Sequence, residues 1–586
     1  MKQFFKFVLA SIVGFALTLF LGFLVFITIV TSIASSFGEK KTLVKENSVL
    51  ELNLGLEIAD RTVEDPFMAI LNGETGSETV GLDRITKVLK EAKNSPKIKG
   101  LFINTSYVGA GFATLEEIRN SLLDFKESGK FIYAYSEFYS EPSYYLASVA
   151  DSIYMNPSGT FLFNGLSSQT AFLTDALKNL GVEMQVIKVG KFKGATETFT
   201  ETKLSDNNRH QTQVFINSIY DNYLKNISSS RKISIDTLKS LADNLTINLP
   251  QDAIDNKLID GLAFIDEVKS TIKRQLNIGQ DKKINFISIN KTYSSNIIKK
   301  EYKKDKIAVI YASGEIRSGN GDNSNVGSET LTKALRDARL NKNIKAIVLR
   351  VNSPGGSALA SDVIYREAEL CAKAKPLIVS MGNLAASGGY FISSAADTIV
   401  AQPTTITGSI GVFMLLPNMQ KLMNDKIGIT YESVNSSKKA DIGRVDRPLS
   451  ADERQYFQNM VNKIYDDFLT RVSIGRNITK EIVDSIGQGR VWTATDAKNI
   501  GLVDVIGGLD KAIEIAAFKA GISDYGIKNL PKVLSPIERI AKNLNGMETS
   551  YIKSKLGKNY GLFQSIEKLN NLEGIQMMLP YEIKID

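Results

Sequence analysis

The 586-residue sequence has one cysteine, Cys371, and one histidine, His210. A single cysteine cannot form an internal disulfide, and zinc sites built from several Cys or His ligands are excluded by count. A Ser-His-Asp or Cys-His mechanism must use His210 or be absent. We expect Cys371, in a helical pattern, to be a small buried apolar residue. We expect His210, at a polar helix start, to be solvated, and we expect no metal and no cofactor.

A localised basic patch is also missing. The net charge is +8, but lysines are scattered between acidic residues, and no basic run is interleaved with aromatic side chains. Nucleic-acid binding normally needs such a patch, so we expect no nucleic-acid partner. Hydrophobic residues make up 43% and charged residues 23% of the chain, as in ordinary globular proteins. The length predicts two or more domains.

Charge is absent from one long stretch near the N-terminus, between Phe7 and Phe37. A membrane-spanning helix needs about 20 apolar residues, and a signal-peptide core only about 7–15. We therefore expect residues 1–46 to form an N-terminal tail and a membrane anchor, with a cleavage site at residues 32–34 as the alternative. Lysines flank both ends, so charge does not set the orientation, but the short leading tail favours an outward-facing body.

The remainder of the chain contains an internal repeat. The stretch SYYLASVADSIYMNP at 143–157 resembles GYFISSAADTIVAQP at 389–403. When the chain is shifted by the same number of residues, GLFINTSYVGAG at 100–111 aligns with AIVLRVNSPGGS at 346–357. Each of these last two is an apolar strand that ends in a glycine-bearing loop and is followed by a helix. Two halves with the same fold explain the matches.

Within each half, short apolar strands alternate with amphipathic helices, which predicts an α/β fold with largely buried strands. A polar, lysine-rich segment between the halves has the composition of a linker. The predicted boundaries are 1–46 for the tail and anchor, 47–290 for the first repeat, 291–305 for the linker, 306–530 for the second repeat, and 531–586 for a C-terminal extension.

The two halves differ at a position that could carry catalysis. At the repeat offset, ASGG at 386–389 aligns with SEPS at 140–143. A serine at a strand-to-helix turn lies at the end of the sheet, and the next amides, including that of Gly388, can stabilise an oxyanion. Pro142 cannot supply the equivalent amide. Gly355 and Gly356 end a separate strand, where a second amide could be donated. Ser387 is therefore a candidate nucleophile, and a simple helix N-cap is the alternative.

Lysine is the natural candidate for the base, since the only histidine is poorly placed. A lysine with a pKa near ~10.4 keeps its proton at neutral pH, but burial can lower the value by up to ~3–5 units. Lys193 in VGKFKGATETF competes with Lys438 or Lys439 in NSSKKADIG. At the repeat offset Lys193 falls on Lys439, so spacing alone does not choose between them.

Four motifs together resemble the bacterial signal peptide peptidase A family, also called protease IV, in its long tandem form: SMGNLAASGGYFIS, RVNSPGGS, TTITGSIGVF and GRVWTATDAKNIGLVD. The resemblance implies two tandem ClpP/crotonase-like domains, each a spiral of ββα units, after an N-terminal transmembrane helix. It implies a dyad split between the halves, with Ser387 as nucleophile and Lys193 as proton acceptor. Gly194 and Thr198 stand where a serine and a proline are common in the family, which leaves the lysine in place.

The same resemblance implies roles for other residues. Ser409 in TGSIG matches the serine that holds the lysine by a hydrogen bond. Gly388 and Gly356 would form the oxyanion hole. Short relatives with one repeat supply the lysine from the position of Lys439, so that residue stays an alternative.

By this resemblance the protein is a membrane-bound serine endopeptidase that degrades cleaved, hydrophobic signal peptides in the membrane. The resemblance also implies a homotetramer in the bacterial inner (cytoplasmic) membrane, with the catalytic body facing the periplasm. Two alternatives are a crotonase-like acyl-CoA enzyme and a catalytically inactive membrane scaffold. The serine in ASGG disfavours the first, because hydratases need carboxylates at the reacting carbon.

Overall fold

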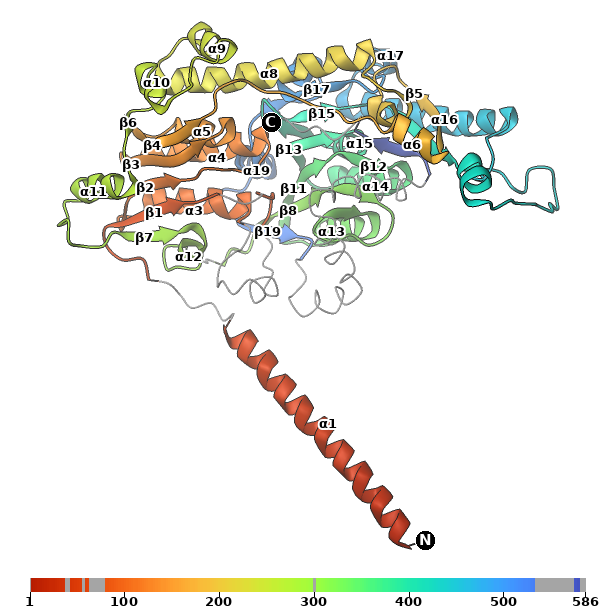
Figure 1. Ribbon diagram of the computed structural model, residues 1–586, viewed down its shortest axis with the longest axis horizontal. Helices are drawn as coiled ribbons and strands as arrows, with labels where there is room; N and C mark the ends of the chain where they lie inside the picture. The colour runs from red at the N-terminus through yellow and green to blue at the C-terminus, as the bar shows by residue number, and fades with distance from the viewer. Residues whose placement is uncertain are drawn as a thin grey trace.

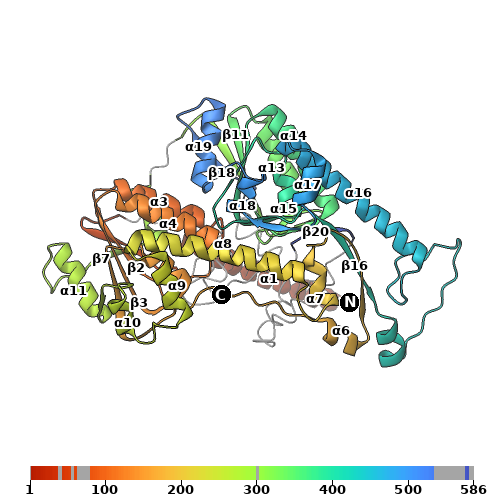
Figure 2. The ribbon, with the colours of Figure 1, turned by 90° about the horizontal axis from the view of Figure 1, so that it is seen from above.

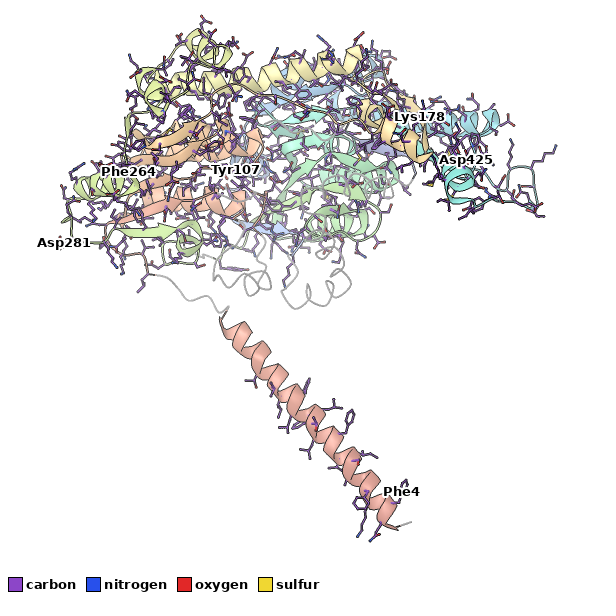
Figure 3. All side chains as sticks on the ribbon, viewed as in Figure 1. Phe4, Tyr107, Lys178, Phe264, Asp281 and Asp425 are labelled. Carbon is purple, nitrogen blue, oxygen red and sulfur yellow. The ribbon has the colours of Figure 1, made fainter. Side chains whose placement is uncertain are left out.

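The computed structural model describes residues 2–36, 43–54, 58–62, 80–298, 302–532 and 574–579. Helix α1 (Lys2–Ser36) projects from an α/β body (Figure 1), and the side chain of Phe4 lies near its outer end (Figure 3). Among the described residues, no helix is both long enough and apolar enough to cross a membrane. The membrane anchor therefore stays a prediction.

The first repeat is built on a parallel six-stranded sheet. Its strands follow the order β6 (Gly261–Leu262), β4 (Ser152–Phe161), β3 (Phe131–Tyr139), β2 (Ile98–Asn104), β1 (Ser48–Leu52) and β7 (Asn285–Ser288). The described helices of this repeat are α3 (Leu82–Asn94), α4 (Phe112–Lys126), α5 (Glu141–Ala147), α6 (Thr174–Leu180), α7 (Glu197–Thr200), α8 (Asp206–Arg231), α9 (Ile235–Asp243), α10 (Pro250–Asp255), α11 (Ile265–Gln275) and α12 (Ile289–Tyr293).

The second repeat has the same plan around an eight-stranded sheet. Its main path is β17 (Val491–Thr493), β15 (Ile406–Gly408), β13 (Leu377–Ala386), β11 (Ile344–Ser353), β8 (Lys306–Ser313) and β19 (Gly526–Leu530), with β14 (Thr398–Ala401) and β18 (Val505–Ile506) beside it. Its helices are α13 (Ser328–Leu340), α14 (Ala358–Ala374), α15 (Gly388–Ser393), α16 (Ala451–Arg476), α17 (Lys480–Ile486), α18 (Ala494–Asn499) and α19 (Leu509–Ala520).

The apolar patterns account for these elements. β11 reads IKAIVLRVNS and is buried along almost its whole length, as expected for a parallel strand that helices cover on both faces. Helix α13 buries Leu331, Ala334, Leu335 and Ala338, whose spacing forms one helical face. The predicted α/β fold is confirmed.

Matching hydrogen bonds recur at equivalent positions of the two repeats. In each repeat, an aspartate after the short helix α5 or α15 accepts a hydrogen bond from an amide at the start of the preceding strand, and a tyrosine of that helix donates to a carbonyl far along the chain. The pairs are Ile132 N to Asp151 Oδ2 and Leu377 N to Asp397 Oδ2, both 2.8 Å, and Tyr144 Oη to Leu258 O, 2.7 Å, and Tyr390 Oη to Leu502 O, 3.0 Å.

A third sheet joins the repeats. Its order is β10 (Asn325–Gly327), β9 (Glu315–Arg317), β12 (Gly355–Ser357), β20 (Gln576–Met578), β16 (Val412–Asn418) and β5 (Glu183–Val189). The first-repeat strand β5 pairs antiparallel with β16 along its full length, from Val412 opposite Val189 to Asn418 opposite Glu183. This pairing carries the chain after β5 into the second repeat.

Helix α8 also connects the two repeats. It runs from the α9–α10 end of the first repeat across to the second (Figures 1 and 2). Ser218 on α8 and Thr493 on β17 lie with their hydroxyl oxygens 3.0 Å apart. The predicted linker at 291–305 begins inside α12, where Thr292 is fully buried, so this part of it packs against the first repeat.

Candidate active site

Ser387 occupies a strained strand-to-helix turn. β13 ends at Ala386, α15 begins at Gly388, and Ser387 between them has φ 55° and ψ −114°. Its amide donates to the Gly408 carbonyl oxygen over 2.8 Å. A non-glycine residue in such a conformation costs about 1–3 kcal/mol and is found mostly at functional sites. Its hydroxyl makes no capping bond, so the interpretation of Ser387 as a simple N-cap is wrong.

The two glycines after Ser387 allow a close approach to the β11–β12 loop. A Cβ added to Gly389 would lie 2.7 Å from the Ser353 carbonyl oxygen, and one added to Gly388 would lie 2.7 Å from Ser361 Oγ. Side chains at these positions would therefore push the helix start away from the loop. Glycine at both positions keeps the Ser387 turn against the second glycine-rich segment.

Lys193 lies directly beside Ser387. Its Nζ is 2.7 Å from Ser387 Oγ, 3.0 Å from Ser409 Oγ and 3.1 Å from the Ser409 carbonyl oxygen. All three residues are fully buried. Burial lowers the pKa of Lys193 well below its usual value of 10.5, because the charged amine loses its hydration. The site therefore favours an uncharged amine in contact with a serine hydroxyl.

Main-chain and side-chain contacts from both repeats hold the Lys193 loop. The Phe192 amide donates to the Gln488 carbonyl oxygen over 2.9 Å. Gln211 on α8 donates from Nε2 to the Phe192 carbonyl oxygen at 3.2 Å and accepts from the Val491 amide at 3.1 Å. A Cβ added to Gly489 would lie 2.8 Å from Lys193 Cβ, so only glycine leaves room there for the lysine.

A second buried polar group lies just beyond Lys193, and the sequence interpretation missed it. Glu197 accepts from Ser205 Oγ at 2.7 Å and from Asn208 Nδ2 at 2.5 Å. A Cβ added to Gly194 would lie 2.7 Å from Asn208 Nδ2, which accounts for glycine where the family often has serine. The glutamate four residues after the lysine in KGATE was the available signal.

The other candidates lie elsewhere. Lys439 is exposed, and its Nζ lies 2.9 Å from Asp452 Oδ2; Lys438 is also exposed. His210 is exposed on α8, as expected. Cys371 is fully buried in α14, as expected, and burial raises the pKa of its thiol to about 12.

The segment with Gly355 and Gly356 meets the Ser387 turn. Gly355 has φ 100°, and a Cβ added there would lie 2.7 Å from the Gly388 amide nitrogen. Gly356 has φ 153° and lies between Ile316 of β9 and Met577 of β20. The two glycine-rich segments therefore meet at the Ser387 turn.

The equivalent turn of the first repeat is an ordinary helix start. Ser140 caps α5 by accepting from the Ser143 amide. Glu141 is the first-repeat residue equivalent to Ser387. It is buried and accepts a hydrogen bond from the Asn164 amide at 3.0 Å. Burial raises the pKa of this carboxyl group. The turn thus has a helix cap and a buried acid where the second repeat has its strained serine.

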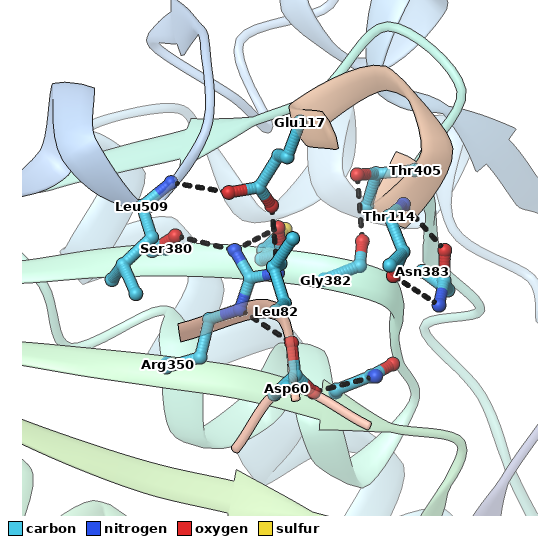
Figure 4. Close-up of polar contacts among 12 residues, drawn as sticks. Asp60, Leu82, Thr114, Glu117, Arg350, Ser380, Gly382, Asn383, Thr405 and Leu509 are labelled. Atoms are coloured by element: carbon cyan, nitrogen blue, oxygen red, sulfur yellow. Dashed lines mark hydrogen bonds and ion pairs between the residues drawn. The ribbon is translucent and has the colours of Figure 1, made fainter. Parts of the chain in front are cut away.

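The first repeat contacts the serine-bearing strand through the start of α4 (Figure 4). Asn383 on β13 donates to Thr114 Oγ1 at 2.9 Å and accepts from the Thr114 amide at 3.0 Å. Asn383 lies on the same strand, at the start of the motif NLAAS that ends at Ser387. The α4 start, which directly follows the first repeat's counterpart of the SPGG segment, therefore anchors the strand that ends at the serine.

A buried ion cluster lies next to this contact (Figure 4). Arg350 on β11 has Nε 2.8 Å from Asp60 Oδ1 and Nη2 2.7 Å from Glu117 Oε1. Burial alone would lower the pKa of Arg350, but the carboxylates of Glu117 and Asp60 raise it above its ordinary value. Both acids belong to the first repeat, so the cluster couples the two halves electrostatically.

Comparisons with known proteins show which family the chain belongs to. Residues 124–279 and 369–523, one segment from each repeat, match the family described as Peptidase family S49. The chain belongs to peptidase family S49. It is therefore a serine peptidase, and the resemblance to signal peptide peptidase A is confirmed. Residues 299–406 also match the Clp protease family, so this S49 peptidase has ClpP-like domains.

Three relatives are similar over most of this S49 chain. Protease 4 of Haemophilus influenzae is 34% identical, covering 85% of this chain and 83% of that protein. Protease 4 of Salmonella typhi is 37% identical over 77% and 75%. The chloroplastic serine protease SPPA of Arabidopsis thaliana is 32% identical over 91% and 77%. These matches favour the peptidase over the acyl-CoA alternative.

Proposed function

We propose that this S49 peptidase uses Ser387 as nucleophile and Lys193 as proton acceptor. The distance of 2.7 Å between Lys193 Nζ and Ser387 Oγ in a buried site is the observation that carries the proposal. A desolvated lysine is uncharged at a lower pH than a solvated one, so it can accept the hydroxyl proton. The exposed Lys439 lacks this desolvation.

The reaction is an acyl transfer in two stages. Ser387 Oγ bonds to the peptide carbonyl carbon while its proton passes to Lys193 Nζ, which then protonates the leaving amine as the C–N bond breaks. Water next attacks the acyl-enzyme, gives a proton to Nζ, and releases the carboxylic acid as Ser387 regains its proton. The Gly388 amide, with that of Gly356 as a second donor, stabilises the oxyanion. Ser409 orients the lysine.

The substrate class we propose is the hydrophobic signal peptide left in the membrane after cleavage from a secreted protein. Two features support a membrane location: the uncharged stretch from Phe7 to Phe37, and the exposed apolar side chains of α1, such as Phe15 and Phe20. The resemblance to signal peptide peptidase A supports the rest of the proposal, a homotetramer anchored in the bacterial inner membrane with its catalytic body on the periplasmic side.

Active-site labelling tests the dyad. A serine-directed fluorophosphonate, read by peptide mass spectrometry, should modify Ser387 in the wild type and in Lys439→Ala. It should fail in Lys193→Ala, which should also lose peptide hydrolysis. Lys439→Ala is the matched control because it occupies the repeat-equivalent position. Full activity in Lys193→Ala together with loss in Lys439→Ala would contradict the assignment, and an unlabelled, inactive wild type would favour the scaffold alternative.

A further inference from the structure

Helix α8 brings a buried amide side chain, that of Gln211, to the loop that carries Lys193. Its Nε2 donates to the Phe192 carbonyl oxygen at 3.2 Å and to Asn208 Oδ1, and its Oε1 accepts from the Val491 amide at 3.1 Å. Burying an unpaired amide is unfavourable, so a glutamine here must keep these partners. One of them is the backbone directly before Lys193.

The bond to Val491 connects Gln211 with the strand pair that holds the nucleophile. Val491 begins β17 and lies opposite Gly408 on β15. The Gly408 carbonyl oxygen accepts from the Ser387 amide at 2.8 Å. The Gln211 side chain therefore bridges the backbone beside Lys193 and the strand pair to which the Ser387 turn is bonded.

A second buried amide fixes the orientation of Gln211. Asn208 lies about one turn earlier on α8, is fully buried, and accepts from Gln211. Its own Nδ2 donates to Glu197 Oε1 at 2.5 Å, and Ser205 Oγ donates to the same oxygen at 2.7 Å. Because Asn208 is itself held, the amide of Gln211 has one favoured orientation, with its oxygen toward Val491.

This network acts on Lys193 through geometry rather than through charge. The Glu197 carboxylate is engaged by its two donors, while Arg490 and Lys191 lie over the Phe192 ring, at 5.3 and 5.6 Å from its centroid. Loss of hydration lowers the pKa of Lys193, and no charge among the described residues is a further cause. What the network can change is how closely the lysine loop is held.

We propose that Gln211 is a positioning residue for the dyad. It ties the Lys193 loop to the β15–β17 pair and thereby sets the distance between Lys193 Nζ and Ser387 Oγ. This inference rests on the proposed function. Gln211 acts through the backbone of Phe192 and not on the reacting atoms. Without its bonds the loop is held less closely, the amine lies farther from the hydroxyl, and water reaches it.

The test replaces Gln211 by methionine in the full chain, because methionine has a similar volume and lacks the amide donors. We expect kcat at neutral pH to fall by up to about 100-fold with KM unchanged, since a small misplacement of a reacting group has effects of that size. The midpoint of the pH dependence of kcat should move upward, because water stabilises the charged amine of Lys193. Part of the lost activity should therefore return at higher pH.

Ser218→Ala is the matched control. Ser218 lies on α8 about two turns beyond Gln211 and contacts the same strand, with its hydroxyl oxygen 3.0 Å from that of Thr493. The replacement removes a polar contact between the same helix and strand without touching the Lys193 loop. Its kcat and pH midpoint should equal those of the wild type.

Circular dichroism and urea denaturation establish that each variant is folded. Where Gln211→Met is not, Gln211→Asn takes its place; its side chain is one methylene shorter, so the same upward shift is expected. A folded Gln211 variant with the wild-type kcat and pH midpoint would overturn the inference, as would an equal shift in Ser218→Ala. Either outcome with Lys193→Ala inactive leaves the dyad intact, whereas full activity in Lys193→Ala would refute the proposed function itself.

Discussion

At the scale of single residues, the contacts of Lys193 match the bonding capacity of an uncharged primary amine. Such an amine has two N–H donors and one lone pair. The carbonyl oxygen and Oγ of Ser409, at 3.1 and 3.0 Å, can accept the two N–H groups. The lone pair then points to Ser387 Oγ at 2.7 Å. In the proposed mechanism, Ser409 therefore leaves Lys193 only one direction in which to accept a proton.

This geometry predicts how activity depends on pH. Below the pKa of Lys193 the amine is protonated and cannot accept the Ser387 proton, so kcat/KM should fall as pH decreases through that pKa and reach a plateau above it. Because burial depresses the pKa, the midpoint should lie well below 10.5. A pH–rate profile of hydrolysis measures it.

Lys193→Arg is the control for this profile, because a guanidinium keeps its proton over the whole range and should leave the enzyme inactive at every pH. A midpoint near the ordinary lysine value, or a flat profile, would contradict the role of Lys193 as base.

At the scale of elements, the first turns of α4, which follow the first repeat's counterpart of the SPGG segment, hold the second repeat. Thr114 binds Asn383 on β13, and Glu117 pairs with Arg350 on β11. β11 leads into Ser353 and the glycines, and β13 leads into Ser387. The start of α4 thus supports both strands that build the site.

Breaking the ion cluster should be costly. Arg350→Met leaves Asp60 and Glu117 buried without their partner, and removing one member of a buried ion pair typically costs about 3–5 kcal/mol. We expect the free energy of unfolding, measured by urea denaturation, to fall by about that amount.

Arg336→Met provides the comparison for Arg350→Met. Its side chain is 53% exposed and pairs with Glu367, which keeps a second partner in Arg339. Because Arg336 is exposed and Glu367 keeps Arg339, we expect Arg336→Met to cost only about 0–1 kcal/mol. Equal losses in the two variants would show that the buried cluster does not couple the repeats.

At the scale of the whole molecule, the candidate site exists only because the two repeats interlock. β5 from the first repeat joins β16 of the second, and the lysine loop then rests on Gln488 and Gly489. Helix α8 covers both repeats from one side (Figure 2). Neither repeat by itself contains both Lys193 and Ser387.

The proposed anchor makes a prediction at this scale. The full chain, expressed in bacteria, should stay in the membrane pellet after alkaline carbonate extraction, because the uncharged stretch from Phe7 to Phe37 buries in lipid. Replacing Leu17 and Leu21 by aspartate should release it, since charges at mid-helix oppose insertion. The same double replacement at the exposed Leu340 and Leu359 of the body should not. Recovery of the wild type in the carbonate supernatant would refute the anchor.

The sequence by itself determined the α/β class, the duplication and the candidate serine. Apolar periodicity and local glycine patterns are short-range properties, and two copies of one pattern can be compared directly along the chain. The scarcity of histidine directed attention to lysine. The same local information could not distinguish Lys193 from Lys439, because both follow the same repeat pattern.

Only the tertiary structure decided which lysine is desolvated beside Ser387, since burial depends on segments far apart in the chain. Lys193 is enclosed by Ser409, Gly411 and Gly489 of the other repeat, whereas Lys439 faces solvent. The Arg350 cluster and the position of β20 were likewise invisible in the sequence. Their partners come from opposite repeats or from the far end of the chain, and no local pattern encodes such pairings.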